Sequence, residues 1–174
     1  MHLRFNLVVL FTTFQLLQLE LVRAHVSSTA TAYRTADDYL RGHNHYRRMI
    51  RTGQGTRQPR SSNLHNLVWN RTLENKARQM SRRCQFVHEE YGENMHAGTS
   101  LLLDPLKHWF DENKLFSFRP IAKASLNRYG HYTQMVWADT KSVGCWRNKC
   151  QWLKLPQSSP MKDAYFTVCK YFPV

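Results

Sequence analysis

The sequence predicts an α+β sandwich, with helices early in the chain and strands late. Three observations predict this class. Residues 36–53 and 70–84 repeat apolar side chains at helical spacing. Residues 142–147 and 164–172 are short, aromatic and β-branched, as strands are. No internal repeat breaks this order, so helices packed against one sheet are the expected arrangement.

The first helix is expected to begin after Thr35 and to end near Gly53. Thr35 and Asp38 stand three residues apart, as in a capping box. Apolar and aromatic residues then recur at helical spacing, at Tyr39, His43, Tyr46 and Ile50. Residues 53–63 carry Gly, Pro, Ser and Gln without a pattern, so they are expected to form a surface loop.

A second helix is expected to begin after Asn70, whose side chain suits the capping position. Leu73, Ala77, Met80 and Cys84 fall on one stripe, so the helix would present Cys84 at its end. Asn70-Arg71-Thr72 is also a glycosylation sequon. Asn70 is therefore both a candidate helix cap and a candidate N-glycosylation site.

The later elements are a third helix and two strands. Asp104 followed by Pro105 is a strong helix start, and the helix should continue to about Lys114. Both faces of 164–172 are apolar, which is typical of a central strand covered on each side. The segment 130–137 mixes helical spacing with strand-forming residues, so its conformation stays open.

The N-terminus is expected to be a cleaved signal peptide at residues 1–24. Arg4 precedes an apolar run from Leu7 to Leu19, and a small residue, Ala24, ends the stretch. The run is too short and too polar for a membrane anchor. Residues 25–35 are expected to form a flexible lead and residues 36–174 the folded domain. An exported protein is secreted to the extracellular space.

The chain is strongly basic. The whole sequence has 25 Lys and Arg against 12 Asp and Glu, and removing Arg4, Arg23 and Glu20 with residues 1–24 leaves 23 against 11, or +12. In residues 41–83 Glu74 is the only acid. Such a field attracts anionic glycans, acidic lipid headgroups or acidic proteins, although a merely solvated basic face fits equally. Secretion argues against nucleic acid as a partner.

The cysteines are expected to form disulfides. An even number in an exported chain is typical of a disulfide framework, and these four allow three pairings. A zinc site of four cysteines would need two closely spaced pairs, and only Cys145 and Cys150 come near each other. The four cysteines are Cys84, Cys145, Cys150 and Cys169.

Two histidines and two glutamates form the candidate site. If His88, Glu93, Glu112 and His131 converge, the imidazoles would hold a divalent ion and the carboxylates would orient them. The residues around His88 lack the second histidine of the helical zinc-protease motif. Taken singly, a histidine is more often a structural residue than a metal ligand.

Ordered motifs spread over nearly the whole predicted domain give these residues a context. The chain is similar in them to the CAP superfamily, which groups cysteine-rich secretory proteins, insect antigen 5 and plant pathogenesis-related 1 proteins. The motifs are His-Asn-x-x-Arg (43–47), Trp-Asn-x-x-Leu (69–73), Cys-x-x-x-His (84–88), Gly-Glu-Asn (92–94), Trp-Phe-x-Glu (109–112), Gly-His-Tyr-Thr-Gln-Met-Val-Trp (130–137), Val-Gly-Cys (143–145) and Val-Cys-x-Tyr (168–171).

The resemblance implies one SCP-type domain, a three-layer αβα sandwich with a central, mainly antiparallel sheet. It implies that the four candidate residues line one cleft, with His88 and His131 as ligands of a divalent metal such as zinc that the fold does not require. It also implies the disulfides Cys84–Cys150 and Cys145–Cys169. The sequence departs from the family pattern after Phe172, where a Pro-x-Gly-Asn end is usual, so functions that need a cysteine-rich tail, such as ion-channel block, are not carried over.

Three functions remain open at this stage. The first is a secreted binding protein that takes a lipid or sterol, with Phe116, Phe118, Ile121 and Leu126 as contacts, unless these residues only pack their own loop. The second is a metal-dependent hydrolase or protease with Glu93 or Glu112 as base. No serine or free thiol stands in a nucleophile motif, so we expect no enzyme. The third is a basic ligand of glycans or proteins in defence or reproduction.

Overall fold

A single four-stranded sheet organises the part of the chain that the structure describes, Tyr33 and residues 35–174, in a computed structural model. The strand order is β1-β3-β4-β2. β1 runs parallel to β3, and the β3–β4 and β4–β2 pairs are antiparallel. The sheet is therefore mainly antiparallel. The strands are β1 (Val68–Trp69), β2 (Glu93–Gly98), β3 (Ser142–Leu153) and β4 (Met161–Phe172).

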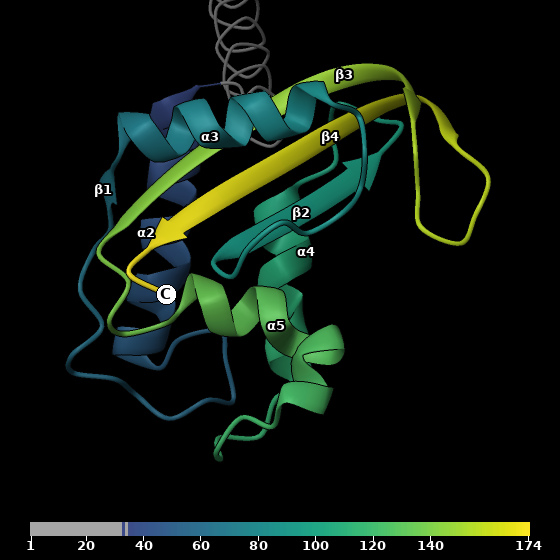
Figure 1. The fold of residues 1–174 in the computed structure, drawn as a ribbon. Helices are drawn as coiled ribbons and strands as arrows, with labels where there is room; N and C mark the ends of the chain where they lie inside the picture. Colours follow the sequence, from purple (N-terminus) through teal and green to yellow (C-terminus); the bar gives the residue numbers. More distant parts are fainter. Residues whose placement is uncertain (1–32, 34) are drawn as a thin grey trace, which may run out of the picture. The chain divides into compact units, whose positions relative to one another are not determined.

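Helices cover both faces of this sheet, so the expected three-layer αβα architecture is confirmed (Figure 1). α3 packs on one face over β3 and β4, while α2, α4 and α5 share a core on the other. The helices are α2 (Ala36–Thr52), α3 (Arg71–Arg82), α4 (Pro105–Asp111) and α5 (Leu126–Met135), with 3-10 turns η1 (Glu112–Lys114) and η2 (Lys123–Ser125).

α2 and α3 begin at the capping residues that the sequence indicates. Thr35 and Asp38 form the reciprocal capping box of α2, and Gly53 ends that helix in the left-handed conformation that glycine adopts easily. The Asn70 side chain accepts from the amides of Thr72 and Leu73 at the start of α3. These predictions are confirmed.

The predicted end of α3 was wrong by two residues. The helix stops at Arg82, and Cys84 lies beyond it with a φ of 51°. The Cys84 amide bonds to the carbonyl of Ser81, and its own carbonyl accepts from Lys154 in the segment after β3. Cys84 is therefore held by a turn beside the sheet rather than by the helix stripe.

α4 starts at Pro105 with Asp104 as its cap, as expected, and continues through η1 to Lys114. The open segment 130–137 is mostly helical: α5 runs to Met135, with non-helical angles at Tyr129. β3 and β4 are longer than the expected strands because they form a hairpin that pairs as far as Leu153 with Met161. β4 lies between two partners, as its apolar faces indicate.

Some predictions fall outside what the structure describes. The expected signal peptide at residues 1–24, and residues 25–32 and Arg34 of the expected lead, lie outside the described residues. Tyr33–Val174 forms one compact unit. Among the described residues, no helix is long and apolar enough to cross a membrane.

Candidate functional site

His88 and Glu93 form the first of two histidine–carboxylate pairs. His88 lies in the segment between α3 and β2, and Glu93 is the first residue of β2. Nδ1 of His88 donates to Oε2 of Glu93 across 3.2 Å, because an ionised carboxylate only accepts. The Glu89 amide donates to the same oxygen. The second nitrogen of the half-exposed His88 ring is left for another partner.

The other carboxylate oxygen of Glu93 is bonded to Lys170, its cross-strand neighbour in β4. Both side chains are almost fully buried. Burial alone would raise the pKa of Glu93, but the hydrogen bonds from His88 and Lys170 hold it below its ordinary value. Burial likewise opposes the charge of Lys170, yet its bonds to Glu93 and Glu90 raise its pKa. Glu93 is therefore ionised and fully engaged.

His131 and Glu112 form the second pair. Nδ1 of His131, on α5, donates to Oε1 of Glu112 at the end of α4 across 2.6 Å. Oε2 of Glu112 accepts from the Tyr132 amide at 3.0 Å. The carboxylate thus fixes both the ring and the backbone of α5. The other nitrogen of the partly exposed His131 ring is again left for a partner.

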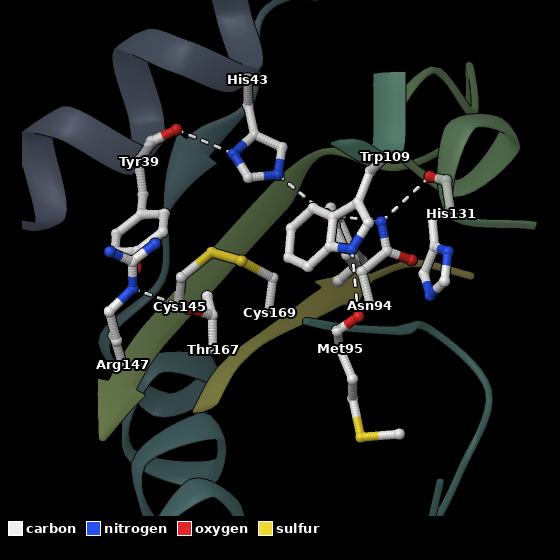
Figure 2. The surroundings of a disulfide bond; sticks show 11 residues. Tyr39, His43, Asn94, Met95, Trp109, His131, Cys145, Arg147, Thr167 and Cys169 are labelled. Atoms are coloured by element: carbon white, nitrogen blue, oxygen red, sulfur yellow. Dashed lines mark hydrogen bonds between the residues drawn. A yellow bond between two sulfur atoms is a disulfide. The ribbon is translucent and has the colours of Figure 1, made fainter. Parts of the chain in front are cut away.

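Asn94 and Trp109 position this second pair. The Asn94 side chain, next to Glu93 on β2, donates to the carbonyl of His131 at 3.0 Å and to the hydroxyl of Tyr171 at 3.1 Å. Trp109 donates to the Met95 carbonyl and stacks on the His131 ring with centroids 5.9 Å apart. Figure 2 shows Trp109 and Asn94 beside His131. One strand, β2, therefore supports both pairs.

Among the described residues, no hydrogen bond or ion pair joins the two histidine–carboxylate pairs. In the same part of the chain, the group of three potential metal ligands whose ligand atoms all lie within 4.8 Å of one another is His43, Cys145 and Cys169. This group does not suit a metal, because both sulfurs are joined in a disulfide and both His43 nitrogens are bonded, to Tyr39 and Tyr171 (Figure 2). Shared ion binding by His88 and His131 stays a prediction.

The disulfides tie the site to the sheet. The structure contains Cys84–Cys150 and Cys145–Cys169, the pairing that the resemblance implies. Cys145 and Cys169 face each other across β3 and β4. The second disulfide joins Cys84, in the turn after α3, to Cys150 in the second half of β3. Cys84 stands four residues before His88. The segment that carries His88 is thus anchored at its start.

A cavity of about 780 Å³ lies between the loop at residues 53–63 and the segment from Phe116 to Ile121, and none of His88, Glu93, Glu112 and His131 lines it, although Tyr132 does. The predicted contacts Phe116, Phe118 and Ile121 line it, whereas Leu126 does not. Ile50, Leu64 and Val136 supply further apolar walls. The loop at 53–63, expected only to lie on the surface, forms one side of this cavity.

The basic stretch at residues 41–83 does not form one surface. Arg47 is buried, and its guanidinium donates to the carbonyls of His65, Met135, Trp137 and Thr140. Arg71 and Arg83 are ion-paired with Glu74 and Glu89. Part of the local charge excess therefore stabilises the fold rather than facing a partner.

Sequence reasoning missed residues that contribute to these sites. Lys170 was an unassigned position in Val-Cys-x-Tyr, and its pairing with Glu93 depends on the strand register. Arg47 was counted as surface charge, although its position one turn after His43 on the buried face of α2 was a signal. Arg60, Arg119 and Trp137 at the cavity had no sequence signal.

Comparisons with known proteins agree with this architecture. Residues 40–171 match the CAP domain of the Cysteine-rich secretory protein family. "Venom allergen 5" of Vespula vidua is 35% identical over 161 residues, covering 78% of this chain and 72% of the relative. The solved structure of NaASP2 with Zn2+ superimposes with a TM-score of 0.66 at 22% identity, over 83% of this chain and 82% of that one.

BmVAL-1 superimposes with a TM-score of 0.65 at 24% identity, over 82% of this chain and 80% of that chain. At these identities the two structures show the fold alone. The family match covers most of the described domain, and the allergen relative is aligned over more than two thirds of both chains. This chain belongs to the Cysteine-rich secretory protein family, the CAP superfamily.

Proposed function

We propose that this chain is a secreted, extracellular protein that binds a lipid or sterol in the cavity between the loop at 53–63 and residues 116–121. The observation that carries the proposal is the apolar wall of that cavity. Phe116, Phe118 and Ile121 line the cavity together with Ile50 and Leu64. A volume of about 780 Å³ is within the range of small-molecule sites. Kinship to secreted venom allergens supports the extracellular location.

The cavity is tested with fluorescent lipid probes. Residues 25–174 would be titrated with a fluorescent fatty acid and a fluorescent sterol. Val136→Trp would fill the cavity, because Val136 lines it and is partly buried. We expect the affinity for the lipid probe to fall at least about tenfold, because the tryptophan side chain occupies space that the probe would otherwise fill.

Val87→Trp is the matched control, since Val87 is exposed and does not line the cavity. It should bind the probe as the unchanged protein does. If Val136→Trp binds the probe with the same affinity as the unchanged protein, and thermal unfolding shows that both variants fold, the cavity is not the lipid site. No binding of either probe by the unchanged protein would contradict the proposal itself.

Divalent metal binding at His88 and His131 is a second candidate, favoured by the two histidine–carboxylate bonds. Each Nδ1 is held by a carboxylate, an arrangement that orients an imidazole so that Nε2 serves as a ligand. The donor set therefore fits zinc. A bound ion would supply positive charge to the cleft, and these two rings would hold it.

Calorimetric zinc titration tests this candidate. We expect saturable binding near neutral pH that disappears in His88→Ala/His131→Ala. It should also weaken by about 10- to 100-fold in Glu112→Gln, which removes the carboxylate from His131. His65→Ala/His45→Ala is the control, because both histidines are exposed on other parts of the surface. Binding that survives the first variant would show that these two rings are not the ligands.

The hydrolase alternative has no comparable support. A general base needs a carboxylate directed at a substrate or a water, rather than one already engaged in holding neighbouring groups of the protein. Both oxygens of Glu93 are bonded, to Lys170 and His88, and both oxygens of Glu112 are bonded, to His131 and the Tyr132 amide. We therefore propose binding and not catalysis. The glycan alternative likewise has no specific observation in the 41–83 stretch and stays a prediction.

A further inference from the structure

Two segments that contribute residues to the cavity carry only positive charge among their ionisable side chains. Residues 53–63 contain Arg57 and Arg60, and residues 115–128 contain Arg119, Lys123 and Arg128, with no Asp or Glu in either segment. All five cations are exposed. Arg60 and Arg119 also line the cavity. We call these two segments the basic rim.

Gln58 holds the two segments together. Its side-chain Nε2 donates to the carbonyls of Asn113 and Phe116, at 2.8 and 2.7 Å. The hydroxyl of Thr56 adds a longer bond to the Asn113 side chain. The basic rim is therefore a connected surface, not two independent loops. Asp139 is the exposed acid that follows the lining residues 137–138.

Two large aromatic residues at this cavity face water. Phe118 is 78% exposed and Trp137 is 41% exposed, although both line the cavity. Phe118 precedes Arg119, and Trp137 lies just after α5, so the two approach the cavity from different segments. Large apolar side chains gathered beside a concave site and rimmed by charge are typical of an interaction surface.

We propose that the basic rim docks this protein onto an anionic phospholipid bilayer, with Phe118 and Trp137 entering the headgroup region and the cavity facing the membrane. Arginine and lysine are attracted to the negative surface, and aromatic rings favour the interface. A sulfated glycan would form ion pairs with the arginines and lysine of the basic rim but would leave the Phe118 side chain exposed to water. The bilayer is therefore the partner that matches both features.

The role of this docking rests on the proposed lipid function, because a lipid bound in the cavity would pass to or from the bilayer without crossing water. The surface itself can be tested separately. The binding of the protein to vesicles is measured by sedimentation. The vesicles consist of phosphatidylcholine alone or of phosphatidylcholine with about a third phosphatidylserine. We expect binding only to the anionic vesicles, and weaker binding as salt screens the charges.

Two variants and two matched controls locate the contact. Arg60→Gln/Arg119→Gln and Phe118→Ser should each weaken vesicle binding by about tenfold. Lys76→Gln/Arg82→Gln removes two exposed cations from α3, and Trp152→Ser removes an exposed aromatic ring from the β3–β4 hairpin. Neither control residue set lines the cavity, so both controls should bind vesicles normally.

The outcomes separate the two proposals. Val136→Trp should lose the fluorescent lipid but keep vesicle binding, since it changes the cavity and not the rim. Binding of free lipid without binding to anionic vesicles would overturn the docking and leave the lipid function standing. Equal losses in the rim variants and the α3 control would show nonspecific charge attraction and would also overturn it. Retention on heparin with no vesicle binding would identify a glycan surface instead.

Discussion

Arg47 illustrates, at the scale of one residue, how charge in the sequence becomes structure. Its guanidinium donates to four carbonyls, those of His65, Met135, Trp137 and Thr140, so it joins α2 to the segment before β1 and to the end of α5 and the residues after it. A planar group with five donors can do this, and an ammonium group cannot. In each histidine–carboxylate pair, the carboxylate likewise joins separate parts of the chain, because it accepts from a histidine ring and from a backbone amide.

Replacing Arg47 should therefore cost more than replacing its neighbour. Arg47→Met leaves buried carbonyls without donors, so we expect the free energy of unfolding to fall by about 3 kcal/mol or more. Urea unfolding followed by circular dichroism measures this. Arg48→Met changes an exposed arginine on the same helix and should stay within about 0.5 kcal/mol of the unchanged protein. Similar losses in both variants would refute the structural role of Arg47.

At the scale of elements, the sequence predicts what is local and misses what depends on register. Thr35, Asn70 and Asp104 mark helix starts because capping uses bonds within one turn. β2 was missed because Glu-Asn-Met-His-Ala-Gly has no apolar alternation. Its buried Glu93 and Asn94 are satisfied by partners far along the chain, at Lys170 and Tyr171. The meeting of all four residues in one cleft is predicted only from the family resemblance and stays a prediction, since no spacing in the sequence indicates which carboxylate meets which histidine.

The disulfide after α3 gives an element-scale prediction. Cys84 and Cys150 are separated by 66 residues, so their bond restricts a long loop of the unfolded chain. Cys84→Ala/Cys150→Ala should lower the free energy of unfolding by about 4 kcal/mol on chain-entropy arguments. It should also release the Cys84–His88 segment, seen as faster amide exchange there but not in α2. Unchanged exchange beside His88 would show that backbone bonds alone hold the segment.

At the scale of the whole molecule, the two faces of the sheet hold different buried groups. The face under α3 is packed with Ala, Met, Phe and Val, and the buried Glu93–Lys170 pair lies on the same face, because these two residues stand two positions from Met95 and Val168 on β2 and β4. The opposite face holds buried polar residues, including His43, Asn94 and Tyr171, beside the Cys145–Cys169 disulfide. The His131–Glu112 pair joins α5 to the end of α4 on this second side, whereas Glu93 of the other pair lies on the face under α3. Each face therefore holds buried polar groups, and His43 is a buried histidine of the second face.

The buried His43 predicts how the stability of the molecule responds to acid. Burial lowers the pKa of His43 to about 4, with the bond to the Tyr39 carbonyl opposing and the nearby Arg47 charge adding to the effect. The unfolded chain, whose histidines titrate near 6.5, binds the proton first. The contribution of the neutral His43 to the free energy of unfolding is therefore complete above about pH 6.5. It is lost as the pH falls toward 4, and the loss from this one group is about 3 kcal/mol.

Urea unfolding between pH 4 and pH 7 measures that slope, and NMR titration should show the His43 ring unchanged until the protein is near pH 4. His43→Gln should have a flatter pH dependence whatever its absolute stability, because the group that takes up the proton is gone. His45→Gln, at an exposed position on the same helix, should keep the slope. A His43 ring that titrates near 6.5 in the folded protein would contradict the argument, since neither burial nor the bond to Tyr171 would then favour its neutral form.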